Sequence, residues 1–263
     1  MLKREFKVNL KSFIIWLSIL IIMFLFVFLI YPYIITDDTM KSMDELMKVF
    51  PEDVLKAFNM DMSSISTAYG WLKSEGFMFI LLVVGFYSSY LGGSILLKEE
   101  NDKTIEYLSS LPIKRSRIVT NKIIVGITYI ILMVLILGVF NYIALKLSCD
   151  FEEKQYLLLS ITPLFIGLPL FGINLFISTF MHKTKAVVGI SLGMVFIFYL
   201  LNVLSEISSN VEVLKYFSIY TLADVRNVIT DITINPIYVL VSFSITIVFI
   251  ISSYIVYNKK ELI

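Results

Sequence analysis

Six stretches of this chain are long, apolar and free of charged residues, and this feature limits the possible folds more than any other. The hydrocarbon core of a bilayer is about 30 Å thick, so a helix needs about 20 apolar residues to cross it. A charge at the centre of such a helix costs about 2.5–3.5 kcal/mol on insertion, and none of the six stretches carries one. The sequence therefore predicts membrane-spanning helices over residues 13–35, 77–97, 123–145, 156–181, 186–205 and 237–257.

The composition supports the same class of fold. Hydrophobic residues make up 58% of the 263 residues and charged residues only 16%, whereas soluble domains are about 45–50% apolar and about 25% charged. Spans must be helical here because lipid leaves exposed backbone groups unsatisfied. We expect an all-α integral membrane protein with a single transmembrane domain over residues 1–263. Its first apolar run is too long for a cleavable signal peptide and is expected to be retained.

The distribution of charge predicts the orientation. Six spans place both termini on one side, together with the segments 98–122 and 182–185, and that side holds 14 basic and 6 acidic residues. The other side holds 8 basic and 15 acidic residues, including the large loop 36–76 between the first two spans. Because basic residues stay in the cytoplasm, both termini are predicted to be cytoplasmic.

Several segments have a further pattern. Before the first span, apolar residues recur at four-residue spacing among lysines and an arginine, which fits either a helix on the membrane surface or a basic tail that only sets topology. Loop 36–76 is predicted to hold two short amphipathic helices, and a third is expected around residues 213–217. The fourth span contains Pro163 and Pro169, which predict a kink or break.

The most informative segment is the predicted cytoplasmic loop at residues 98–122. Asn101 or Asp102 is suited to cap a short helix that runs to Leu111, and Pro112 ends it. Three apolar residues would form one stripe along this helix. A short, rigid helix with charged groups facing the cytoplasm suits the transmission of a push from a soluble partner better than the binding of a small molecule.

This loop resembles the coupling loop of the ABC type 2 permeases. In that family an acidic residue precedes a T-(L/I)-E-x-L helix, followed by P-(V/I)-(S/T)-R and by a lysine that opens the third span. Lys114 departs from the family's small hydroxyl residue, and residues 258–262 resemble the family's basic-acidic-leucine end. The matching residues here are Glu100, Thr104, Ile105, Glu106, Leu108, Pro112, Ile113, Arg115 and Lys122.

The resemblance implies a permease that works with a second copy or a homologous permease and with a separate ABC ATPase subunit. ATP and magnesium would bind in that partner, and no cofactor would bind this chain directly. Three glutamates would meet basic groups of the ATPase, and two arginines would brace the loop. The alternative is a charged loop that only enforces topology, although this does not account for four acidic residues. The implied ATPase-coupling residues are Glu99, Glu100, Thr104, Ile105, Glu106, Leu108, Leu111, Pro112, Arg115 and Arg117.

The chain lacks the residues that an enzyme or a metal site would need. No glycine is followed by lysine, so the phosphate-binding motif of ATPases is absent. His182 is the only histidine, and it is expected to be a loop residue and no metal ligand. We therefore predict no catalytic, cofactor or metal residue. Cys149 is the only cysteine and is expected to be a free thiol, with an intermolecular disulfide as the alternative.

A few polar and small residues lie within the predicted spans. Gly189 and Gly193 form a G-x-x-x-G pattern that allows close helix approach, either within one subunit or between two. Asn141, Asn174 and Asn202 are expected to form interhelical hydrogen bonds or to line a transport path.

The expected function is that of the membrane subunit of an ATP-driven exporter for an amphipathic or hydrophobic substrate such as a peptide, drug or lipid. An ion-coupled secondary transporter is the main alternative, but it usually carries ionisable groups at mid-membrane, and the predicted spans contain none. A scaffold that transports nothing is the other alternative. Frequent Ile, Lys and Asn are typical of an AT-rich bacterial genome, so the expected location is a bacterial cell membrane, with no role for nucleic acid.

Overall fold

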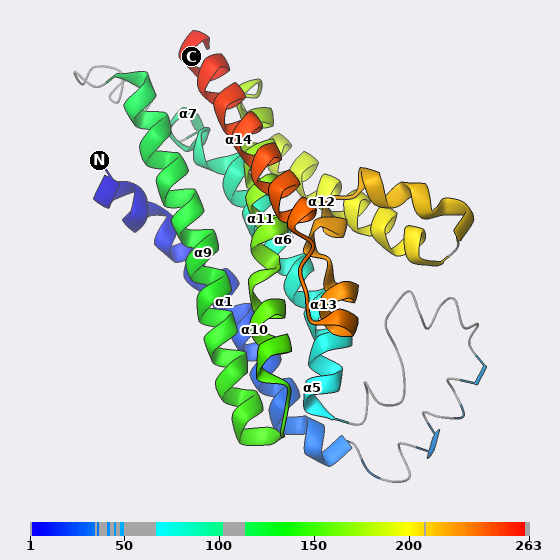
Figure 1. The fold of residues 1–263 in the computed structure, drawn as a ribbon. Helices are drawn as coiled ribbons and strands as arrows, with labels where there is room; N and C mark the ends of the chain where they lie inside the picture. Colours follow the sequence, from blue (N-terminus) through cyan, green and yellow to red (C-terminus); the bar gives the residue numbers. More distant parts are fainter. Residues whose placement is uncertain are drawn as a thin grey trace.

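The computed structural model describes residues 2–34, 67–101, 114–207 and 209–260, together with positions 36, 41, 42, 45, 48 and 49. These residues form helices and connecting segments and contain no strand (Figure 1). The main helices are α1 (Leu2–Ile34), α5 (Ala68–Trp71), the π-helix η1 (Leu72–Gly76), α6 (Phe77–Ile95), α7 (Lys98–Asn101), α9 (Arg115–Ser148), α10 (Glu153–Ile161), α11 (Pro163–Thr179), α12 (Thr184–Ile207) and α14 (Pro236–Lys259).

Six of the described helical stretches are long and apolar enough to cross a membrane. Each overlaps one of the predicted spans, so the prediction of six spans in an all-helical membrane protein is confirmed. Every one of these stretches extends beyond the corresponding charge-free interval at one end at least. The stretches are Leu2–Tyr31, Ala68–Ile95, Arg115–Ser148, Glu153–Thr179, Thr184–Glu206 and Pro236–Lys259.

Local sequence explains where several helices begin. The Thr67 hydroxyl accepts a hydrogen bond from the Gly70 N–H and caps α5. Asn235 caps α14 in the same way, directly before Pro236. The predicted break in the fourth span lies at Thr162, between α10 and α11, because Pro163 starts a new helix. The amphipathic segment before the first span is not a separate helix, since α1 continues through it from Leu2.

The centre of the bundle is formed by α6 and α11, which pack against each other and against α9, α12 and α14. Glycine makes this contact possible: a Cβ atom on Gly92 of α6 would lie 2.4 Å from the carbonyl oxygen of Phe171 in α11. A Cβ atom on Gly126 of α9 would lie 2.4 Å from the Phe171 ring. In contrast, α1 and α14 are peripheral, and apolar side chains such as Phe26 and Ile247 are exposed on them, as expected for surfaces that face lipid.

Three short helical elements follow α12. They are the 3-10 helices η2 (Ser209–Phe217) and η3 (Ile219–Ala223), and α13 (Val225–Asp231). The element η2 folds back along the end of α12 (Figure 1), so the helix expected around residues 213–217 is present in 3-10 form. The two amphipathic helices predicted in loop 36–76 lie almost entirely outside the described residues.

The start of α1 and the end of α14 lie at the same end of the bundle (Figure 1). Helix α7, the start of α9 and the short turn between α11 and α12 reach this end as well, because they contact Lys260 or Lys122 there. The charge distribution of the sequence predicts that this end faces the cytoplasm.

Candidate functional site

Lys122 forms the centre of a buried ion-pair cluster at the end of the bundle that holds the termini. Its side chain is fully buried, and its Nζ lies 2.6 Å from Glu99 Oε2 and 3.4 Å from Glu5 Oε2. Nζ also donates a hydrogen bond to the carbonyl oxygen of Ile95, at 2.6 Å, in the last turn of α6. A buried ammonium group is tolerated only when its charge is paired and its donors are used. Lys122 meets this condition and thereby joins α1, the end of α6, α7 and α9.

Aromatic contacts hold α1 in the position that this cluster requires. The Tyr129 hydroxyl of α9 donates to the carbonyl oxygen of Phe6 at 2.6 Å, and its ring stacks on Phe13 with centroids 4.8 Å apart. Because Phe6 is the neighbour of Glu5 and Phe13 lies about two turns further along the same helix, these contacts hold the Glu5 carboxylate beside Lys122.

A second ion-pair cluster lies beside the first and is centred on Glu100. Its carboxylate is 2% exposed and accepts hydrogen bonds from Lys260 Nζ at 2.8 and 3.1 Å. His182 Nδ1 lies 3.3 Å from the same carboxylate, and Lys260 Nζ also donates to the carbonyl oxygen of Met181. This second cluster therefore joins α7 to the turn before α12 and to the end of α14.

The described residues on either side of the segment 102–113 contact the same residue, Lys260. Before the segment, Glu100 binds the Lys260 ammonium group; after it, the Arg115 guanidinium donates to the Lys260 carbonyl oxygen at 2.8 Å. These contacts join the residues on both sides of the segment to α14, and Glu99 and Lys122 join them to α1 and α9.

The structure places only part of the predicted coupling residues. Glu99 and Glu100 are buried in ion pairs within the chain, so in this structure their carboxylates face the bundle and not a partner. Arg115 contacts Lys260, and Arg117 is exposed at the start of α9. The remaining coupling residues lie outside the described residues, as does the predicted helix beyond Asn101: Thr104, Ile105, Glu106, Leu108, Leu111 and Pro112.

Sequence reasoning missed Glu5 and Lys260 as members of these clusters, and it used Lys122 only as a motif match. His182 also has a partner in Glu100, which its position in a short turn did not indicate. No group of three or more potential metal ligands occurs among the residues that the structure describes.

The other predicted sites have different outcomes. A Cβ atom built on Gly189 or Gly193 would meet no atom of another described element within 4 Å, so close packing of these two glycines inside the subunit is not seen in its described part. Asn202 forms an interhelical hydrogen bond with the Thr221 hydroxyl of η3, at 3.2 Å. The Asn174 amide instead donates to Leu170 in its own helix, and Asn141 is buried. Cys149 is a free, partly buried thiol.

Comparison with known proteins identifies the family of the chain. The family model described as "ABC-2 family transporter protein" matches residues 1–262. No curated protein and no solved structure matches the chain. Since the match covers nearly the whole chain and the structure has six helices able to cross a membrane, the chain belongs to the ABC-2 family of transporter proteins and is a multi-pass membrane permease subunit of an ABC transporter.

Proposed function

We propose that this permease is driven by a separate ATPase subunit that binds ATP and magnesium, and that it exports amphipathic or hydrophobic substrates from a bacterial cell. The observation that carries this proposal is the attachment of both ends of segment 102–113 to Lys260. Force applied to that segment from the cytoplasm would reach three of the six spans, α1, α9 and α14, through defined ion pairs.

In this proposal Glu99 and Glu100 transmit force within the permease. Their carboxylates pair with Lys122 and Lys260, so direct contact with the ATPase is assigned to residues between them and Arg115, with Glu106 as the main acidic contact. Arg117 is exposed at the start of α9 and is placed to meet the ATPase or lipid headgroups. This division separates residues that bind the partner from residues that pass on its movement.

We further propose that two permease subunits pair along α12. Gly189 and Gly193 present an open, glycine-lined surface there, and small residues allow close approach of helices in a membrane. The second subunit is either an identical copy or a homologous permease.

Association with the ATPase tests the proposal. The permease is purified in mild detergent from its native cells, and the copurifying proteins are assayed for ATP hydrolysis. Wild-type permease should retain an ATPase, and Glu106→Lys should reduce the retained amount. Glu153→Lys is the control, because Glu153 is exposed at the opposite end of the bundle. Equal recovery of the ATPase with both variants would overturn the assignment of Glu106, and transport by permease free of any ATPase would overturn the proposed energy source.

A further inference from the structure

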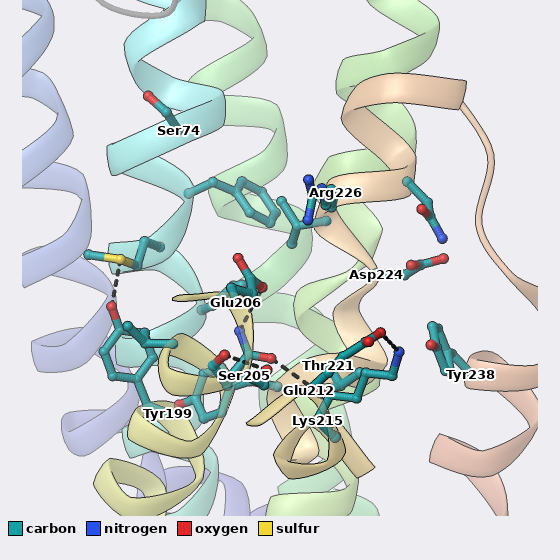
Figure 2. Close-up of a pocket in the computed structure, with 18 residues that line it drawn as sticks. Ser74, Tyr199, Ser205, Glu206, Glu212, Lys215, Thr221, Asp224, Arg226 and Tyr238 are labelled. Carbon is teal, nitrogen blue, oxygen red and sulfur yellow. Dashed lines mark hydrogen bonds and ion pairs between the residues drawn. The ribbon is translucent and has the colours of Figure 1, made fainter. Parts of the chain in front are cut away.

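A cavity of about 480 Å³ lies in the half of the bundle remote from the two ion-pair clusters. It is enclosed by the first part of α6, the end of α12, η2, η3, α13 and the start of α14 (Figure 2). Its volume falls within the range of about 300–1,000 Å³ that is usual for small-molecule sites. By the orientation inferred from charge, the cavity opens on the external side.

Aromatic and apolar side chains form much of the cavity wall. Tyr199 and Tyr220 meet edge to face with ring centroids 5.7 Å apart, and Phe77 and Leu81 of α6 also line the wall. Tyr220 is only 4% exposed, and its hydroxyl has no hydrogen-bond partner among the described residues. This hydroxyl lies against Gly85 of α6, which does not line the cavity, so Tyr220 contributes its ring to the wall.

The ionisable residues of the cavity include more carboxyl groups than basic groups. Glu212 and Lys215 pair with each other at the rim and cancel (Figure 2). The remaining charged residues in the lining are Glu206, Asp224 and the exposed Arg226. Apart from the Glu212–Lys215 pair, the lining therefore contains two carboxyl groups and one guanidinium group.

A third carboxylate adds to this excess from the neighbouring π-helix η1. Glu75 directly follows the cavity-lining residue Ser74, and its buried Oε1 atom has no hydrogen-bond partner in the described part of the chain. Tyr199 itself donates to the sulfur of Met78 (Figure 2). The wall around Tyr199 thus combines an aromatic face with two nearby carboxylates.

We propose that this cavity binds an amphipathic organic cation, with its charged group near Glu206 and Tyr199 and its apolar part against Phe77 and Leu81. Aromatic faces and carboxylates both attract cations, and an apolar wall adds affinity for a hydrophobic body. The predicted external segments carry 15 acidic and 8 basic residues, which would also raise the local concentration of cations. As a statement about substrate class, this inference rests on the proposed export function.

Two ions of similar shape and opposite charge test the proposal. The full-length permease, without ATPase or nucleotide, is placed in lipid nanodiscs, and binding of tetraphenylphosphonium and tetraphenylborate is measured by equilibrium dialysis against empty nanodiscs. We expect saturable binding of the cation in excess of lipid partitioning and none of the anion. Equal saturable binding of both ions, or of neither, would overturn the proposal.

Substitutions locate the binding site. Glu206→Gln and Glu75→Gln should each weaken binding of the cation by about tenfold or more, because each removes a charged partner. Glu153→Gln makes the same change outside the cavity and should leave the binding unchanged. If Glu206→Gln bound the cation as tightly as Glu153→Gln did, the cavity would not be the site. Because no ATPase is present, these results are independent of whether an ATPase copurifies with the permease.

Discussion

Lys122 Nζ lies 2.6 Å from Glu99 Oε2 in a site where the lysine side chain has no contact with solvent. Lys122 belongs to the third span and Glu99 to the short helix that follows the second. A pair of this kind holds two elements in a defined relative position, because separating the charges would leave each of them buried and unpaired.

Removal of the lysine charge should therefore destabilise the permease strongly. We expect Lys122→Met to lower the free energy of unfolding by about 3–5 kcal/mol, since Glu5 and Glu99 lose their buried partner. The double variant Lys122→Met/Glu99→Gln should lose clearly less unfolding free energy than Lys122→Met alone, because it also removes one of the unpaired carboxylates. Unfolding in detergent, followed by tryptophan fluorescence, measures both. If the loss of stability in the double variant equalled the sum of the losses in Lys122→Met and in Glu99→Gln, the pairing would be contradicted.

Lys260 should control the local stability of α7. Lys260→Met removes the partner of Glu100, so backbone amides of α7 should exchange hydrogen for deuterium several times faster than in the wild type. Hydrogen-exchange mass spectrometry in nanodiscs measures this change. The neighbouring exposed Lys259 provides the control, and Lys259→Met should leave the exchange of α7 unaltered.

Two glycines in different surroundings should respond in opposite ways to alanine. Gly92→Ala places a methyl group against the Phe171 carbonyl and should destabilise the fold by about 1–3 kcal/mol. Gly189→Ala meets open space and should be neutral, or stabilising by up to about 1 kcal/mol, since alanine favours helix. Thermal unfolding compares the variants. Equal losses for both would be inconsistent with the described packing of α6 on α11.

The same open surface provides a test of subunit pairing. Gly189→Leu adds bulk that the described part of the subunit accommodates, so the fold should be retained while pairing through α12 is weakened. Crosslinking in native membranes should then give a smaller dimer fraction than in Gly189→Ala. An undiminished dimer fraction would place the interface elsewhere.

Cys149 should show a characteristic pH dependence. Burial raises the pKa of its thiol above the ordinary value, so the reactive thiolate is scarcer in the folded protein at any given pH. Between pH 7 and 9 the rate of maleimide labelling should rise by about tenfold per unit without levelling off, whereas the unfolded chain should react faster at pH 7 and level off earlier. A membrane-impermeant maleimide added to intact cells should label this only cysteine. Labelling that requires membrane disruption would reverse the predicted orientation.

The spans were predictable from sequence because membrane insertion depends on local composition and length. The ion pairs were not, because they join residues far apart in the chain: Glu5 and Lys122 are separated by 117 positions and Glu100 and Lys260 by 160. In the sequence each of these charges resembles an ordinary residue at the end of a span. The charge-free interval of the third span begins at residue 123, directly after Lys122, and therefore excludes the residue that joins α9 to three other elements.

The glycines show a similar limit. The spacing of Gly189 and Gly193 indicates that two small residues share one face of a helix, but not what that face contacts. Gly92 and Gly126 have no comparable pattern with each other, and their role follows only from the position of Phe171 between α6 and α9. The cavity likewise combines residues from seven elements, which sequence pattern alone does not bring together.

The response of the ATPase to the permease tests the central claim most directly. The complex of permease and copurified ATPase is reconstituted in nanodiscs, and the rate of ATP hydrolysis is compared for the ATPase alone, for the wild-type complex and for complexes with Lys122→Met or with the charge-conserving Lys122→Arg. We predict that the wild-type permease changes the rate severalfold, that the fraction of Lys122→Met that assembles no longer changes it, and that Lys122→Arg retains part of the change. An assembled Lys122→Met complex that changes the rate as the wild type does would contradict force transmission through this ion pair.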